Sequence, residues 1–274
     1  MRKLRPVLLL FTFLLIPSAL NAQQVSTSAP RDPQSLTLLQ RSLAALVGTS
    51  TVNDVTLTGN ARRIAGSEDE SGTATLNATA TGQGRMDLNL PAGQRSEVVD
   101  ISQAVPAGKW CGMDGVWHPM AAHNLFADPT WFFPTFLINR VLSGANYAIS
   151  PMDAETQDGV AVEHLQMYQQ ASSTPELVAL TQTLSQIDIY LNPSTLLPVR
   201  IMYNAHADNN ALVNIPVRIE FSDYQTVQGT LIPYHIQKYI QNGLALDVTV
   251  TNAQVNPSVA ASRNSKLNRS TARK

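Results

Sequence analysis

The sequence predicts a mainly β protein, built on an antiparallel sheet with a few helices. Apolar and polar residues alternate through most of residues 187–256, most regularly at 217–221. Successive side chains on a strand point to opposite faces, so this pattern predicts a sheet with one apolar and one solvated face. Asn242-Gly243 and Asp114-Gly115 predict tight hairpin turns, because these residue types tolerate positive φ.

The first 22 residues are expected to form a signal peptide. Arg2, Lys3 and Arg5 give a basic start, and residues 7–16 form an apolar run. A run of about ten residues is too short to span a bilayer, and Ala22 supplies a small residue at a cleavage point. We expect a periplasmic or secreted chain with no transmembrane segment after cleavage, although an uncleaved anchor remains the alternative.

One domain, residues 32–256, is predicted between a polar linker at 23–31 and a basic, disordered tail at 257–274. Once the three basic residues of the signal peptide and the five of the tail are set aside, 11 basic residues remain against 20 acidic ones. An acidic body argues against nucleic acid as a partner.

Three segments have helical patterns. Asp32-Pro33 can begin a helix that ends at Gly48, and Thr174-Pro175 can begin a short helix to about Thr183. The aromatic segment 128–144 also indicates a helix, in which Pro134 either causes a kink or marks the true start. Strands are expected near 55–62, 73–80, 85–90, 96–101, 109–113, 116–120, 147–149 and 160–168, and a loop at 208–214.

Motifs for catalysis and metal binding are absent from the sequence. It has no Gly-x-Ser-x-Gly elbow, phosphate-binding glycine loop or His-Glu-x-x-His. The closest histidines, His118 and His123, have a spacing that fits no common metal site. Cys111, the one cysteine, cannot form an internal disulfide and is expected to be buried. We therefore expect no enzyme activity, catalytic residue, metal or cofactor; the alternative is a hydrolase whose site residues come together from distant parts of the chain.

The closing stretch carries a family resemblance. Leu197-Pro198-Val199-Arg200, the turn at Val227-Gln228-Gly229 and Leu231-Ile232-Pro233-Tyr234 look like corresponding motifs of the periplasmic lipoprotein carriers. The chain thus resembles the LolA/LolB-like family. The resemblance implies a curved antiparallel sheet, an unclosed half-barrel with helices covering its concave face. It also implies that acyl chains are held in the hollow between sheet and helices.

Two features fit such a hollow. Ala74, Leu76, Ala78 and Ala80 give one strand an unusually small apolar face, and residues 131–142 supply a large apolar cover. Ordinary core packing is the alternative for both. The candidate ligand-binding residues are Leu76, Trp131, Phe132, Phe133, Phe136, Leu137 and Leu142.

The expected function is binding of a lipid acyl chain or a lipoprotein in this hollow, as a carrier in the cell envelope. The alternative is an envelope sensor or protein-interaction module that uses the same fold without bound lipid, with an envelope protein as its partner. The extra segment at 172–185 and the basic tail motivate this alternative, because they depart from the best-known carriers.

Overall fold

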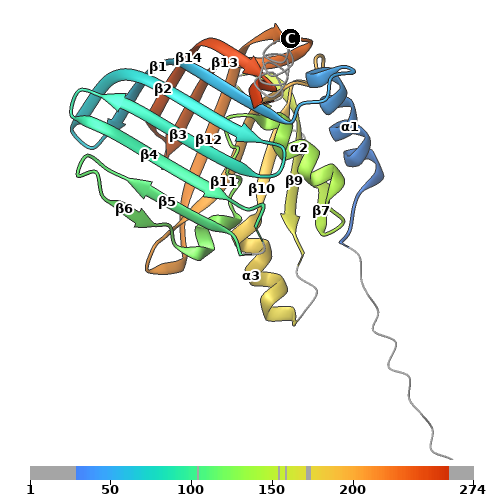
Figure 1. Ribbon diagram of the computed structural model, residues 1–274. Coiled ribbons are helices and arrows are strands. Elements are labelled where there is room, and N and C mark those ends of the chain that lie inside the picture. Colours follow the sequence, from blue (N-terminus) through green and yellow to red (C-terminus); the bar gives the residue numbers. More distant parts are fainter. Residues whose placement is uncertain (1–28, 104, 154, 158, 171–173, 259–274) are drawn as a thin grey trace, which may run out of the picture.

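The computed structural model describes residues 29–258, except 104, 154, 158 and 171–173. Its strands form a single large antiparallel sheet that curves around a hydrophobic core (Figure 1). The strands are β1 (Asp54–Ala65), β2 (Glu68–Thr79), β3 (Gln83–Leu90), β4 (Gly93–Asp100), β5 (Ala107–Cys111), β6 (Trp117–Pro119), β7 (Tyr147–Pro151), β8 (Glu155–Gln157), β9 (Val160–Gln169), β10 (Ile187–Leu191), β11 (Pro198–Ala207), β12 (Asn210–Val227), β13 (Thr230–Ile240) and β14 (Gly243–Val255).

The sheet is unclosed, which confirms the predicted half-barrel. The strand order is β6-β5-β4-β3-β2-β1-β14-β13-β12-β11-β10-β9-β7, with β8 paired to β9 outside this path. The first and last strands therefore meet in the middle of the sheet, where Val55 lies opposite Val255. The alternation at 187–256 predicted one buried and one solvated face. This is confirmed on β12, where Ile219 and Phe221 are buried while Ser222 is exposed.

Two hairpin turns differ in detail from the prediction. Between β13 and β14 the left-handed residues are Gln241 (φ 49°) and Asn242 (φ 68°), one position earlier than Asn242-Gly243. Gly243 instead opens β14 and pairs with Ile240. The predicted loop at 208–214 was too long, because β12 already begins at Asn210. The run Asp208-Asn209-Asn210 therefore made the predicted loop longer than the observed turn.

Three α-helices lie in the described part of the chain: α1 (Pro33–Val47), α2 (Pro134–Ser143) and α3 (Pro175–Ser185). The Asp32 carboxylate accepts from the Ser35 backbone N–H at 2.7 Å, the predicted N-cap of α1. Leu39 and Leu46 of α1 are buried in the core. The short 3-10 helix η1 (Ala122–Phe126) connects β6 toward α2.

The segment just before α1 fastens α1 to α2 and to the sheet. Asp32 N donates to Ile149 O, and Ile149 N donates to Pro30 O, so this segment pairs alongside β7. The Arg31 guanidinium donates to Val141 O at 2.9 Å and to Gly144 O at 2.8 Å. A cation thereby satisfies the free carbonyls at the C-terminus of α2.

Several predictions lie outside the described residues. These are the signal peptide at 1–22, the linker at 23–31 apart from its last residues, and the tail at 257–274 apart from residues 257 and 258. Within the described ranges, no helix has the length and apolar character that crossing a membrane requires.

Candidate functional site: an apolar pocket at the end of α2

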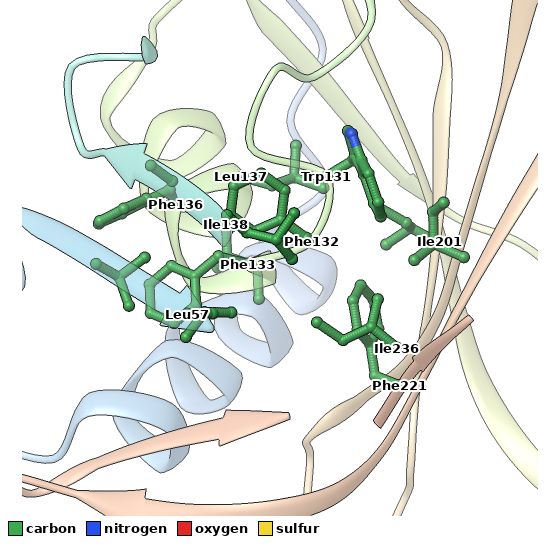
Figure 2. Packing of buried hydrophobic residues seen from close by; sticks show 14 of the residues in the cluster. Leu57, Trp131, Phe132, Phe133, Phe136, Leu137, Ile138, Ile201, Phe221 and Ile236 are labelled. Carbon is green, nitrogen blue, oxygen red and sulfur yellow. The ribbon is translucent and has the colours of Figure 1, made fainter. Parts of the chain in front are cut away.

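An aromatic segment fills the centre of the concave face. Phe132, Phe133 and Phe136 are at most 1% exposed, and Trp131 is 4% exposed. Figure 2 shows these side chains packed between Leu57 of β1 and a group on the opposite wall, Ile201, Phe221 and Ile236. The hollow predicted from the sequence is thus occupied by the protein's own side chains.

The predicted helix begins at Pro134, which confirms the alternative that Pro134 marks its true start. Phe133 takes the N-cap position with no side-chain cap, and Pro134 occupies the first turn, where its missing N–H is not needed. The Asp128 carboxylate instead turns back on its own segment and accepts from Thr130 N and Thr130 Oγ1, both at 2.7 Å. The residues before Pro134 form a turn, in which Phe133 N donates to Thr130 O at 2.8 Å, and Trp131 and Phe132 of this turn are buried in the core.

The predicted ligand-binding residues lie together, but none of them lines the pocket that opens beside the C-terminal end of α2. Six of them are buried in the core cluster, and Leu142 packs against that cluster while half-buried. These six are Leu76, Trp131, Phe132, Phe133, Phe136 and Leu137. Small side chains on β2 do face this cluster, since Ala74 and Ala78 are each 2% exposed. Their contact with a ligand therefore stays a prediction.

A pocket of about 560 Å³ opens beside the C-terminal end of α2. One wall is apolar and comes from the β4–β5 connection and from η1. It consists of Ile101, Val105, Pro106, Ala122, Leu125 and Phe126. The other wall comes from α2, the residues after it, and β9. It consists of Arg140, Ser143, Gly144, Asn146, Tyr147 and Gln169. A pocket with one apolar and one polar side suits an amphipathic molecule.

The charge on the polar wall is compensated internally. Arg140 Nη1 lies 3.2 Å from Asp128 Oδ1, and Arg140 Nη2 donates to Thr130 Oγ1 at 3.3 Å. Burial lowers the pKa of Arg140, but the charges and hydrogen bonds of Asp128 and Tyr147 together outweigh burial, and the net direction is upward. Burial also raises the pKa of Tyr147, whose hydroxyl oxygen accepts from Gln169 at 3.2 Å. The polar wall therefore offers hydroxyl and amide groups and a paired cation.

Sequence reasoning missed this pocket. Its walls come from four separate segments, and η1 has no apolar periodicity that would mark it. One local signal was present, because Asp128-Pro129-Thr130 is a short polar motif directly before an aromatic run. Interpreted as a turn rather than a helix start, it would have predicted that the Asp128 carboxylate accepts a hydrogen bond from the Thr130 backbone N–H.

A second polar cluster lies on the outer face of the sheet. His164, 7% exposed, approaches Glu155 and Asp188, each at 2.9 Å, and stacks on Tyr190 with ring centroids 4.2 Å apart. No group of three or more candidate ligands with metal-binding geometry occurs among the residues the structure describes. The cluster links β8, β9 and β10, because Glu155, His164 and Asp188 come from these three strands.

The β5–β6 hairpin differs from the rest of the outer surface. Trp110, Met113, Val116 and Trp117 are each 40–53% exposed there. Cys111 is half-buried rather than buried as predicted, because β5 lies close to the open edge of the sheet.

Comparison with solved structures supports the expected fold. A domain from Vibrio parahaemolyticus, described as an outer membrane lipoprotein-sorting protein, aligns with a TM-score of 0.52 and 10% identity, over 82% of this chain and 93% of the other. A DUF1329 family protein from Desulfovibrio piger aligns with a TM-score of 0.52 and 11% identity, over 84% and 95%. A LolA superfamily protein from Nitrosomonas europaea aligns with a TM-score of 0.48 and 8% identity, over 81% and 93%. No family model and no curated protein matches the sequence.

The resemblance to the lipoprotein-carrier family is thus confirmed as a resemblance of fold, and the chain has the fold of lipoprotein-sorting domains. The descriptions of the Vibrio parahaemolyticus and Desulfovibrio piger structures name no enzyme activity.

Proposed function

We propose that this protein binds a lipid acyl chain, free or carried by a lipidated protein, and acts as a carrier in the cell envelope. The observation that supports the proposal is the pocket at the end of α2, with its continuous apolar wall and facing polar wall. The lipoprotein-sorting description of one structural neighbour and the signal-like N-terminus agree with it.

The size and chemistry of the pocket suit such a ligand. Its volume of about 560 Å³ lies within the range of small-molecule sites. An acyl chain gains roughly 0.8 kcal/mol for each buried CH₂ group, so partial burial against Leu125 and Phe126 is enough for binding. The polar wall would then hold the head of the molecule.

The aromatic segment has a secondary role in this proposal. The side chains of Trp131, Phe132, Phe133, Phe136, Leu137 and Leu76 lie in the core of the half-barrel and not in the pocket wall. They would touch a long chain only if the segment at 128–133 shifts and the chain enters the core. Their packing without a ligand is the state that the structure shows.

Native mass spectrometry of protein purified from the cell envelope tests the proposal. We expect adducts with the mass of acyl-chain lipids. Ala122→Trp places an indole on the apolar wall and should reduce the adducts strongly, because Ala122 is an exposed residue that lines the pocket. Ala65→Trp, at an exposed alanine at the end of β1, is the matched control and should keep them. Protein that carries no adduct and binds no lipid probe would contradict the proposal.

A second candidate function is protein interaction without bound lipid. The filled hollow and the exposed Trp110, Met113, Val116 and Trp117 of the β5–β6 hairpin favour it. Clustered exposed aromatic residues are typical of interaction surfaces. In that case Trp110→Ser with Trp117→Ser should abolish a stable complex with an envelope protein, whereas Ala122→Trp should leave the complex unchanged.

A further inference from the structure

We propose that Asp128 determines which acyl ligands the pocket accepts: by pairing with Arg140 it selects esterified or amide-linked chains over free fatty acids. This inference rests on the proposed function and assigns the chemical class of the ligand head. Asp128 acts through Arg140 and is a positioning residue, since it is absent from the pocket wall.

The geometry makes Arg140 a poor anion receptor although it lines the pocket. The Asp128 side chain is 1% exposed and the Arg140 side chain 17% exposed. One carboxylate oxygen, Oδ1, accepts from Thr130 N, Thr130 Oγ1 and Arg140 Nη1. The guanidinium therefore extends from α2 into the preceding loop and is held there by a buried acid.

A free carboxylate in the pocket would have to compete for this guanidinium. Asp128 Oδ2 is buried and receives no hydrogen bond in the described part of the chain. Arg140 is thus the cation that offsets the Asp128 charge. Drawing Arg140 toward a ligand carboxylate would leave Asp128 charged, buried and uncompensated, which is strongly unfavourable. If the Asp128–Arg140 pair instead stays intact, the ligand carboxylate and the Asp128 carboxylate lie near a single cation and repel each other.

The other groups of the polar wall suit an uncharged head. The Tyr147 oxygen accepts from Gln169, which leaves the hydroxyl hydrogen for a ligand carbonyl oxygen. Asn146 and Ser143 add an amide and a hydroxyl at the same wall. Ester and amide carbonyls accept such hydrogen bonds without introducing a net charge into a partly buried site.

The test compares two probes that differ only at the head: a pyrene-labelled dodecanoic acid and its methyl ester. Binding to the mature protein is followed by pyrene fluorescence at about pH 8, where the carboxyl group is ionised. We expect the acid to bind wild-type protein about tenfold more weakly than the ester or worse, a difference of about 1.4 kcal/mol. Asp128→Asn keeps the shape of the side chain and leaves Arg140 unpaired, so it should remove or reverse this preference.

Asp223→Asn is the matched control. It makes the same change in net charge at an exposed residue on β12 and should leave the preference unchanged. Equal binding of acid and ester to wild-type protein would overturn the inference while the proposed function stands. Failure of both probes to bind would overturn both. The wild-type comparison needs no variant, so the inference stays open to refutation even if Asp128→Asn fails to fold.

Discussion

The Lys238 ammonium lies 4.6 Å from the centre of the Trp131 ring. The pair joins β13 to the aromatic loop across the concave face. Burial lowers the pKa of Lys238, but the neighbouring Tyr203 and Glu97 outweigh burial, so the net direction is upward. The lysine therefore stays charged over the Trp131 ring throughout the physiological pH range.

We expect this contact to stabilise the loop at 128–133. Lys238→Ala should lower the free energy of unfolding by about 0.5–2 kcal/mol, the range of cation–π contacts. Lys238→Arg should retain most of it, because a guanidinium also stacks on an indole ring. Chemical denaturation measures both variants. An alanine variant as stable as wild type would show that the contact contributes nothing.

Stability should fall at alkaline pH partly because of Tyr190. Burial, aided by the negative charges of Glu155 and Asp188 and opposed by Arg200, raises the pKa of Tyr190 to about 12. A phenol in the unfolded chain titrates near pH 10, so the unfolded state loses its proton first. The contribution is therefore complete below about pH 10 and is lost as pH rises toward 12, on the order of 2 kcal/mol.

Tyr190→Phe isolates this effect, because the ring stays stacked on His164 while the ionisable group is removed. The free energy of unfolding of the variant should fall less steeply than that of wild type between about pH 10 and 12. Urea denaturation at several pH values gives both curves. Parallel curves would refute the assignment to Tyr190.

Arg31 should hold the C-terminal end of α2 in place. Arg31→Ala removes hydrogen bonds from a cation to Val141 O, Leu142 O and Gly144 O and should cost about 1.5–3 kcal/mol. Arg31→Lys keeps the charge but loses the planar guanidinium group. Its free energy of unfolding should therefore lie between those of the wild type and the alanine variant. Hydrogen exchange of the α2 amides provides the local readout. Unchanged exchange in the alanine variant would show that α2 is held by packing alone.

Gly84 should be required for the aromatic loop to lie close to β3. A Cβ atom at Gly84 would lie 2.0 Å from Pro129 O, so the loop or the strand would have to move. Gly84→Ala should cost about 1–3 kcal/mol and alter the near-ultraviolet circular dichroism of the aromatic cluster. At the control position, Gly112→Ala, the nearest atom is 3.5 Å away and the change should be tolerated.

Local patterns in the sequence predicted most of the strands and helices of the fold. Alternation fixes which face of a strand is buried, as at Ile219 and Phe221, and short-range signals such as Asp32-Pro33 fix where a helix begins. The same locality explains the errors. Residues 208–210, Asp-Asn-Asn, have the composition of a loop, yet Asn210 already pairs with Ala207 of β11. This pairing depends on the tertiary structure and cannot be predicted from the local sequence.

The candidate site was less predictable for a related reason. Hydrophobicity indicated that the segment at 131–137 is buried, but not whether it covers an empty hollow or fills it. Tyr147 and Leu125 both line the pocket only because the fold brings η1 close to the residues that follow α2. Long-range packing of this kind needs the assembled fold.

The meeting of β1 and β14 in the middle of the sheet has a consequence for folding. The other neighbouring strands in the strand order are close in sequence, whereas pairing Val55 with Val255 closes a loop of about 200 residues. Two local meanders can therefore form early, and their joining along the β1–β14 seam should limit the folding rate. A circular permutant that links the two ends and opens between β6 and β7 would turn the whole sheet into one continuous meander. Such a permutant should fold faster than the natural chain.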